Sequence, residues 1–178
     1  GGNALDRPLS EADTLVFGGG AIGLGAALVL RAQGARSIVV AETSPERRAV
    51  LDGLDFRTID PREEALPPVH LVIDGVGIEP TRAAASAAAR PGGVIMHIGL
   101  GSSTGGLDIR RMTLQEITFI GTYTYTAEDF RQTAQAIFDG RLGALDWPEI
   151  RPLAEGARAF DDIAAGTLAA PKIILTPQ

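Results

Sequence analysis

The chain has 178 residues, a net charge of -6 and no cysteine, and 45% of its residues are hydrophobic. This length and composition are typical of one globular domain with a buried core, and the lack of cysteine excludes disulfides and thiolate metal sites from these residues. The acidic charge, without a basic stripe, gives no support for nucleic-acid binding.

The first apolar run extends from Leu15 to Leu30 without a charged residue. It is shorter than the roughly 20 residues that a membrane helix needs, and it contains five glycines. Acidic residues precede it rather than a basic segment, so a signal peptide does not fit. We therefore expect no membrane partner and a cytoplasmic location.

The same run divides into a strand at 13–18, which is short and apolar, and an Ala- and Leu-rich helix at 21–34 that ends at Gly34. Strand and helix patterns then alternate along the chain. Further strands are predicted at 37–42, 56–60, 69–74, 93–99, 116–121 and 172–175. Further helices are predicted at 44–54, with Ser44 as N-cap and Pro45 at the first helical position, at 79–90, after Thr126 and near 154–165.

Two connections carry their own signals. Residues 61–68, PREEALPP, are too few for a helix of normal length, so a loop or a single turn is expected there. Thr126 and Asp129 have the spacing of a capping box, and Gly140 ends the helix that follows. That helix places five residues on one face, namely Phe130, Thr133, Ala134, Ile137 and Phe138.

The alternation of strands and helices, with nearly continuous apolar strands, predicts an α/β fold. The strands would form a doubly wound parallel sheet, covered by helices on both faces in three αβα layers. We expect residues 1–12 to be a leader or the stub of a truncation, and 13–147 to form the main domain. Residues 148–178 would add a helix and a strand that complete this domain or return toward another one.

The sequence GGGAIG at 18–23 matches the G-x-G-x-x-G pattern at a junction between a strand and a helix. Gly18 permits a tight turn, Gly20 lets the backbone approach a pyrophosphate, and Gly23 lets the helix pack closely on the strand. The N-terminus of the helix then offers free N–H groups and a partial positive charge to phosphates. The pattern therefore predicts a dinucleotide site.

An acidic residue supports this hypothesis. Glu42 ends the second strand, nineteen residues after Gly23, which is close to the spacing expected for the acid that binds the adenosine ribose. A carboxylate there accepts hydrogen bonds from ribose hydroxyls and repels a 2′-phosphate, which favours NAD over NADP. Arg47 in the next helix could pair with Glu42 or reach the ribose, or it could be a solvated surface arginine.

Five segments together resemble the cofactor domain of the medium-chain zinc-dependent alcohol/polyol (sorbitol-type) dehydrogenases. The resemblance covers nearly the whole chain from Asp13 onward and implies a Rossmann domain with strand order 3-2-1-4-5-6. The segments are DTLVFGGGAIGLGAALVLRAQGARSIVVAETSPERRAVL, VIDGVG, RPGGVIMHIGL, ITFIGTYTYTAEDF and RPLAEGARAFDDIAAGTLAAPKIILTP.

The resemblance implies a set of cofactor-binding residues in five groups. They would form the pyrophosphate turn, the adenosine-ribose pair, a segment lining the cleft, a strand end that holds the nicotinamide carboxamide, and a segment bordering the same ring. In this order the groups are Gly18, Gly20, Ala21, Ile22 and Gly23; Glu42 and Arg47; Gly75 and Val76; Ile98, Gly99 and Leu100; and Thr122, Tyr123 and Thr124.

In this family a separate catalytic domain carries the zinc ligands and the substrate pocket, and only Gly1–Ala12 precede the first strand here. We therefore expect an NAD(H)-binding domain of an oxidoreductase that transfers hydride between a secondary alcohol or polyol and NAD. Zinc would lie only in the absent domain, and this chain alone would bind cofactor without turnover. The alternative is a stand-alone NAD(H)-binding or regulatory module, which a natural start codon near Gly1 would favour. Glu42 argues against a third possibility, a zinc-independent quinone-reductase relative that prefers NADPH.

Two further expectations concern single elements. His97 lies in an apolar strand and has no orienting acid nearby in sequence, so a buried or cleft-lining role is predicted. Strand 116–121 would lie at an open edge of the sheet, with no proline or lysine to block pairing. The resemblance implies antiparallel pairing of this strand across a two-fold axis, and hence a homodimer.

Overall fold

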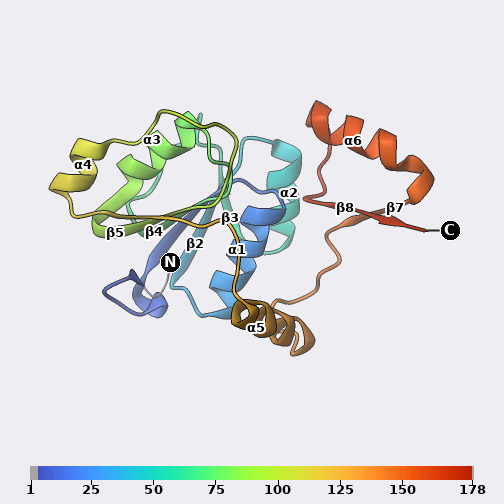
Figure 1. Cartoon of the computed structure of the whole chain (residues 1–178), viewed down its shortest axis with the longest axis horizontal. Helices are drawn as coiled ribbons and strands as arrows, with labels where there is room; N and C mark the ends of the chain where they lie inside the picture. Colours follow the sequence, from blue (N-terminus) through green and yellow to red (C-terminus); the bar gives the residue numbers. More distant parts are fainter. Residues whose placement is uncertain (1–3, 178) are drawn as a thin grey trace.

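Six parallel strands form the central sheet in the computed structural model, which describes residues 4–177 (Figure 1). Their order is β3-β2-β1-β4-β5-β6. The strands are β1 (Asp13–Phe17), β2 (Ser37–Ala41), β3 (Arg57–Ile59), β4 (Val69–Asp74), β5 (Ala89–His97) and β6 (Thr118–Gly121). The predicted doubly wound parallel sheet and its strand order are both confirmed.

Side chains that alternate along the strands build a separate core on each face of the sheet. Leu15 and Phe17 of β1 pack in the core that contains residues of α3 (Glu79–Ala88) and α4 (Ile109–Leu114). Val16 packs in the other core, with residues of α1 (Ala21–Ala32), α2 (Pro45–Gly53) and α5 (Ala127–Phe138). Strand side chains point alternately to opposite faces, so apolar residues at every position bury both sides of the sheet. The three αβα layers are therefore confirmed.

Capping residues fix where two helices begin. The Ser44 hydroxyl accepts a hydrogen bond from Arg47 N at 3.3 Å, and Pro45 occupies the first position of α2. At α5, Thr126 Oγ1 accepts from Asp129 N at 3.1 Å and Asp129 Oδ2 accepts from Thr126 N at 2.9 Å. The hydrogen bond from the Thr126 hydroxyl also lowers the pKa of Asp129. Both caps were predicted from the sequence, and both are present.

The C-terminal segment forms a small unit apart from the main sheet (Figure 1). Strand β7 (Glu149–Pro152) pairs in parallel with β8 (Ile173–Thr176), and α6 (Gly156–Ala165) connects them after a short 3-10 turn. Arg151 links the unit internally, because its guanidinium contacts Glu149 at 2.6 Å and Asp162 at 2.7 Å. The predicted boundaries after residues 12 and 147 stay predictions, and residues 1–3 of the proposed leader lie outside the described residues.

Several elements differ from those predicted. Residues 91–93, at the predicted junction of a helix and a strand, lie inside β5. This strand already starts at Ala89, and the pairing of β4 with β5 shifts register between Val69 and Leu71. Helix α3 therefore ends at Ala88 rather than 90. The short α4 and β7 were not predicted. Residues 61–68 form the expected turn and loop.

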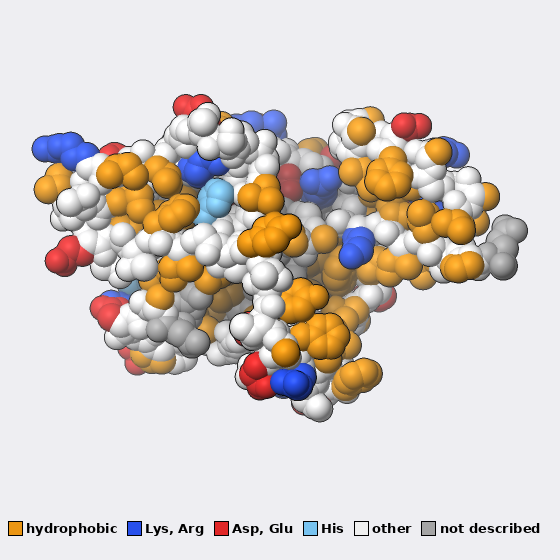
Figure 2. All heavy atoms as spheres, in the orientation of Figure 1, with side chains coloured by type: hydrophobic (Ala, Val, Ile, Leu, Met, Phe, Trp, Pro, Cys, Tyr) orange, Lys and Arg blue, Asp and Glu red, His pale blue; other side chains and the backbone are white. Residues whose placement is uncertain are grey.

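The apolar face predicted for α5 is largely uncovered (Figure 2). Phe130 and Phe138 are 59% and 84% exposed, and Ala136 is the buried residue of this helix. The helix contacts the domain through Ala136 and the following Leu142, so the aromatic residues point away from the core. Among residues 4–177, no helix is both long and apolar enough to span a bilayer.

Candidate cofactor site

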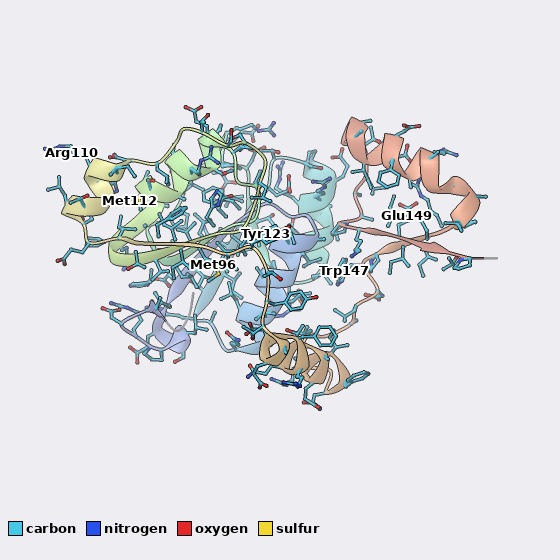
Figure 3. All side chains as sticks on the ribbon, in the orientation of Figure 1. Met96, Arg110, Met112, Tyr123, Trp147 and Glu149 are labelled. Carbon is cyan, nitrogen blue, oxygen red and sulfur yellow. The ribbon has the colours of Figure 1, made fainter. Side chains whose placement is uncertain are left out.

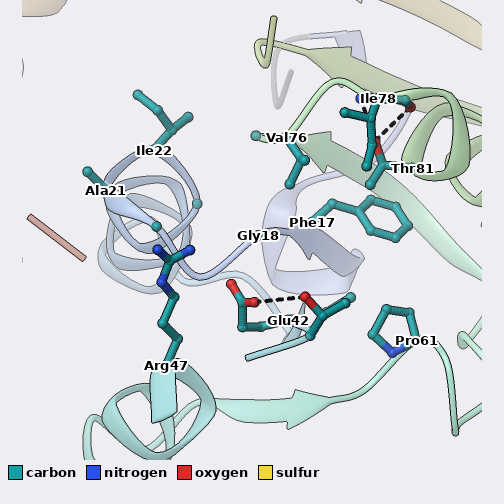
Figure 4. Close-up of a pocket in the computed structure, with 15 residues that line it drawn as sticks. Phe17, Gly18, Ala21, Ile22, Glu42, Arg47, Pro61, Val76, Ile78 and Thr81 are labelled. Atoms are coloured by element: carbon teal, nitrogen blue, oxygen red, sulfur yellow. Dashed lines mark hydrogen bonds between the residues drawn. The ribbon is translucent and has the colours of Figure 1, made fainter. Parts of the chain in front are cut away.

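A cleft of about 410 Å³ opens at the carboxyl ends of β1, β2 and β4 (Figure 4). Strands β1 and β4 are neighbours in the sheet, and the chain reaches β4 only after completing β2 and β3 on the other side. In open α/β sheets, ligands bind outside the strand ends at such a switch point. The geometry of the fold thus selects this cleft as the candidate site.

The turn after β1 is shaped for close approach at two glycines. Gly18 has a φ of +91°, and a Cβ there would lie 2.7 Å from the side chain of Val76. A Cβ on Gly23 would lie 1.7 Å from the carbonyl oxygen of Gly18, so the first turn of α1 packs directly on the backbone before it. Both roles agree with those predicted from the pattern.

The N-terminus of α1 opens into the cleft without a side-chain cap. Its N-cap is Gly20, which offers no acceptor, and the first turn contains no acidic residue. Unpaired N–H groups and the positive end of the helix dipole are therefore free to meet an anion. Ala21 and Ile22 complete this wall of the cleft. The cradle fits the diphosphate of a dinucleotide.

Glu42, directly after β2, is held beside the glycine turn by hydrogen bonds from the backbone. The residue is 6% exposed, and its Oε2 accepts from Gly19 N at 2.6 Å while Oε1 accepts from Ser44 N at 2.8 Å. A carboxylate has about four lone-pair positions, so it can still accept from ribose hydroxyls. Arg47 lines the same cleft, and its Nε donates to Leu168 O at 3.4 Å rather than to Glu42.

A cluster of charges supports the strand ends beside Glu42. Asp60, which follows β3, contacts Arg48 Nη1 at 3.0 Å and Arg62 Nη2 at 2.5 Å. Arg48 also donates to Glu42 O at 2.7 Å, and Arg62 to Thr43 O at 2.7 Å. Hydrogen bonds from Arg62 hold the pKa of Asp60 well below its usual range. The cluster thereby joins the end of β3 to the end of β2, and it was not found from the sequence.

Asp74, at the end of β4, fixes the backbone of residues 76 and 77 beside the cleft. Its fully buried carboxylate accepts from Val76 N at 3.1 Å and Gly77 N at 2.8 Å, and its Oδ2 lies 2.9 Å from Thr81 Oγ1. His97 Nε2 lies 3.8 Å from the same Oδ2, buried and without a hydrogen bond. No acid lies near His97 in sequence, but the pairing of β4 with β5 brings Asp74 next to it in space.

The sequence-predicted residues fall into two places. Nine of them line this cleft, and four line a neighbouring groove of about 920 Å³ along α1. Of the remaining two, Gly99 is buried and Leu100 is 77% exposed. Tyr123, which is labelled in Figure 3, is 87% exposed. The nine are Gly18, Gly20, Ala21, Ile22, Gly23, Glu42, Arg47, Gly75 and Val76, and the four are Ile98, Thr122, Tyr123 and Thr124.

The structure also brings residues to the cleft that sequence analysis missed. They close strands or open a helix, and a polar or small residue directly after an apolar strand is the signal that could have identified several of them. They are Phe17, Ala41, Thr43, Pro61, Ile78 and Thr81. Within residues 4–177, no group of three or more His, Asp or Glu side chains is placed to hold a metal ion, so a zinc site does not fit here.

Comparisons with known proteins agree with this geometry. The family model described as zinc-binding dehydrogenase matches residues 21–139. L-galactonate-5-dehydrogenase of Escherichia coli is 31% identical over 141 residues, which are 73% of this chain and 41% of that protein. (R,R)-butanediol dehydrogenase of Saccharomyces cerevisiae is 26% identical, over 92% of this chain and 48% of its own length.

A solved structure supports the fold. The acetophenone reductase of Geotrichum candidum in complex with NAD superposes with a TM-score of 0.83 at 18% identity, covering 98% of this chain and 50% of that one. The chain thus spans about half the length of the proteins it matches.

Proposed function

Because the chain belongs to the zinc-binding dehydrogenase family, we propose that it binds NAD(H) as the cofactor domain of an oxidoreductase. The reaction is hydride transfer between a secondary alcohol or polyol and NAD. The observation that carries the proposal is the cleft in which the Gly18–Gly23 turn, the open N-terminus of α1 and the buried Glu42 converge. A cytoplasmic location stays a prediction of the sequence.

The proposed cofactor site has two ends. At the diphosphate end, the first-turn N–H groups of α1 bind the diphosphate and Glu42 accepts from the ribose hydroxyls, with Arg47 beside them. At the nicotinamide end, residues 98–100 hold the carboxamide and residues 122–124 border the ring, while Gly75 and Val76 line the path between the ends. Bound NAD supplies the hydride acceptor, and the residues of this chain orient it.

Cofactor preference tests the assignment of Glu42. A 2′-phosphate beside this carboxylate meets like-charge repulsion and loses the ribose hydrogen bonds. Hydrogen bonds to a charged group contribute about 1.5–3 kcal/mol, which corresponds to about tenfold to a hundredfold tighter binding of NADH than of NADPH. Calorimetric titration with both cofactors measures the ratio, and equal or tighter binding of NADPH would overturn the assignment.

Binding without turnover is the second part of the proposal. The described residues hold no set of side chains that fits a zinc ion, which would polarise the alcohol. NADH fluorescence should therefore report binding, while NAD reduction with a panel of polyols and added zinc should stay at background. Zinc-dependent reduction by the purified chain would contradict this part and leave the binding assignment intact.

We also propose a homodimer through β6. The strand lies at the end of the sheet order, its Phe119 is 37% exposed, and Thr118 is exposed beside it. An unblocked edge of this kind invites antiparallel pairing with a second copy. Sedimentation should show a dimer at tens of micromolar, and Phe119→Lys should shift it to monomer. A wild-type monomer at that concentration would refute the dimer.

A further inference from the structure

Arg82 is a buried cation near the start of α3, with 6% of the residue exposed. A guanidinium has five N–H groups, and here each has an acceptor. Among the described residues, no carboxylate oxygen lies within 4.0 Å of the Arg82 guanidinium, and all of its hydrogen-bond acceptors are neutral. Nε donates to Gly105 O at 2.6 Å, Nη1 to Gly77 O at 2.9 Å and Ser102 O at 3.1 Å, and Nη2 to Ser102 Oγ at 2.8 Å and Thr104 O.

Four of these five acceptors belong to the loop at 98–106, which follows β5. Residues 100–105 of the loop are exposed and have the sequence LGSSTG, so no buried apolar side chain anchors this stretch. Backbone hydrogen bonds provide the other attachments. At the start of the loop Ile98 N and Gly99 N donate to Asp74 O at 2.9 and 3.0 Å, and further along Gly101 N donates to Val76 O at 3.1 Å and Ser102 N to Gly77 O at 2.9 Å. The loop is therefore attached both to the Arg82 guanidinium and to the backbone of the segment after β4, which lines the cofactor cleft.

We propose that Arg82 is a positioning residue that fixes the 98–106 loop and, through it, the nicotinamide end of the cofactor site. This inference rests on the proposed function, because residues 98–100 are assigned there to the carboxamide. Gly77 O accepts from both Arg82 and Ser102 N, so one guanidinium sets the spacing between the loop and Val76–Gly77. Hydrogen bonds from a charged donor are stronger than neutral ones, and a loop with little buried apolar surface depends on them.

A lysine cannot replace the fork of N–H donors that the Arg82 guanidinium presents. Its ammonium is a compact group with three donors and cannot reach acceptors spread around a planar guanidinium. Arg82→Lys should therefore keep the charge and lose most of the attachment, whereas Arg82→Gln loses both. The pair of variants separates the geometry of the fork from its charge.

Arg111 offers a matched control. This half-buried arginine of α4 also donates to backbone carbonyls near α3, namely Ser86 O at 2.7 Å, Ala89 O at 3.0 Å and Ala87 O at 3.3 Å. Its partners lie at the C-terminal end of α3, at the start of β5, whereas the cleft lies at the carboxyl ends of the strands. Arg111→Gln therefore removes a comparable packing arginine without touching the loop.

The test compares NADH with ADP-ribose, which lacks the nicotinamide ring and carboxamide. In the wild-type chain NADH should bind more tightly than ADP-ribose. Arg82→Gln should weaken NADH binding by about tenfold, the effect expected from one or two lost carboxamide hydrogen bonds, and leave ADP-ribose within about twofold. Arg111→Gln should change neither ligand, and Arg82→Lys should fall nearer to Arg82→Gln than to wild type.

The outcomes separate this inference from the proposed function. If wild type binds NADH and ADP-ribose equally, both the nicotinamide assignment and the role of Arg82 fail. If wild type discriminates and the folded Arg82 variants still do, the role of Arg82 alone fails. Hydrogen exchange at Gly101 and Ser102 gives a readout without ligand: it should be faster in Arg82→Lys and unchanged in Arg111→Gln, and unchanged exchange in Arg82→Lys would also overturn the proposal.

Discussion

At the diphosphate end of the proposed cofactor site Gly23 is buried and Glu42 is 6% exposed, whereas at the proposed nicotinamide end Leu100 is 77% and Tyr123 is 87% exposed. The first end is formed by β1, α1 and β2, which pack against one another. The second end consists of loops after β5 and β6, the last strands of the sheet order. In the proposed complex, packed elements would therefore hold one half of the dinucleotide, and exposed loops would border the other half.

This difference follows from the position of each strand in the parallel sheet. Near its centre, each strand end is fixed by neighbours on both sides, so a backbone turn that follows it is held in place. Toward the edge, the loops after β5 and β6 have few buried contacts and depend on hydrogen bonds such as those from Arg82. The predictions below test whether binding and stability follow this division.

The largest effect is expected from Gly23→Ala. The added Cβ would lie 1.7 Å from Gly18 O, and backbone cannot yield as a flexible side chain does. Overpacking of this kind costs about 1–3 kcal/mol of the free energy of unfolding, and displacement of the turn should reduce NADH affinity by at least about tenfold. Thermal unfolding and fluorescence titration measure the two effects.

Gly25→Ala provides the control in the same helix. A Cβ at Gly25 meets no atom within 4 Å, so the substitution should be neutral or raise the free energy of unfolding by about 0.5–1 kcal/mol. NADH affinity should not change. Equal losses in both variants would mean that the close approach of Gly23 to Gly18 does not control this end.

The next effect concerns Glu42→Gln. Glutamine keeps an acceptor for Gly19 N but lacks the charge that repels a 2′-phosphate. The preference for NADH over NADPH should shrink by about tenfold. Glu46→Gln is the matched variant, because Glu46 is exposed and accepts from Ser44 Oγ at 2.8 Å. An unchanged ratio in Glu42→Gln would leave Glu42 with a purely structural role.

The smallest effect is expected near the amino end of β4, away from the cleft at the carboxyl ends of the strands, where His70 is 8% exposed. Burial lowers the pKa of His70, and the nearby charges of Arg7 and Arg90 lower it further. A lowered pKa in the folded state means that stability is fully present above the unfolded value near 6.5 and is lost as the pH falls below it. One group changes the free energy of unfolding by at most about 1.4 kcal/mol per pH unit.

Urea unfolding of wild type and His70→Gln between pH 7.5 and pH 5 tests this prediction. The variant should show the shallower decline toward acid, and the NADH affinity of the two proteins should respond to pH in the same way. A steeper decline in the variant would contradict the assigned direction of the pKa shift.

The sequence predicted the centre of the molecule better than its periphery. The strands that pack on both faces, such as Val69–Asp74, have apolar runs that only burial explains, so their place in a parallel sheet follows from the pattern. The turn at Gly18 and the caps at Ser44 and Thr126 depend on residues a few positions away. Each of these features is local, and each was found from sequence.

The features that were missed depend on contacts between distant segments. Asp74 and His97 meet because β4 pairs with β5, and Asp60 meets Arg48 because α2 returns alongside β3. Strand β7 contains two charged residues and a proline, and it is a strand because β8 pairs with it. The exposed aromatic residues of α5 have the period of a buried face, and only the arrangement of the domain shows that this face is uncovered.

The hydrogen bond from Gly19 N to Glu42 joins the two parts of the diphosphate end into one thermodynamic unit. A ribose that hydrogen-bonds to the Glu42 carboxylate would shift the glycine turn that binds the phosphates. Phosphates that displace this turn would in the same way shift the carboxylate. By linkage, the coupling free energy between the two subsites has the same value in both directions. Adenosine and pyrophosphate offered as separate molecules should therefore each alter the affinity for the other by one common factor, which makes this short contact a measure of cooperativity within a single binding site.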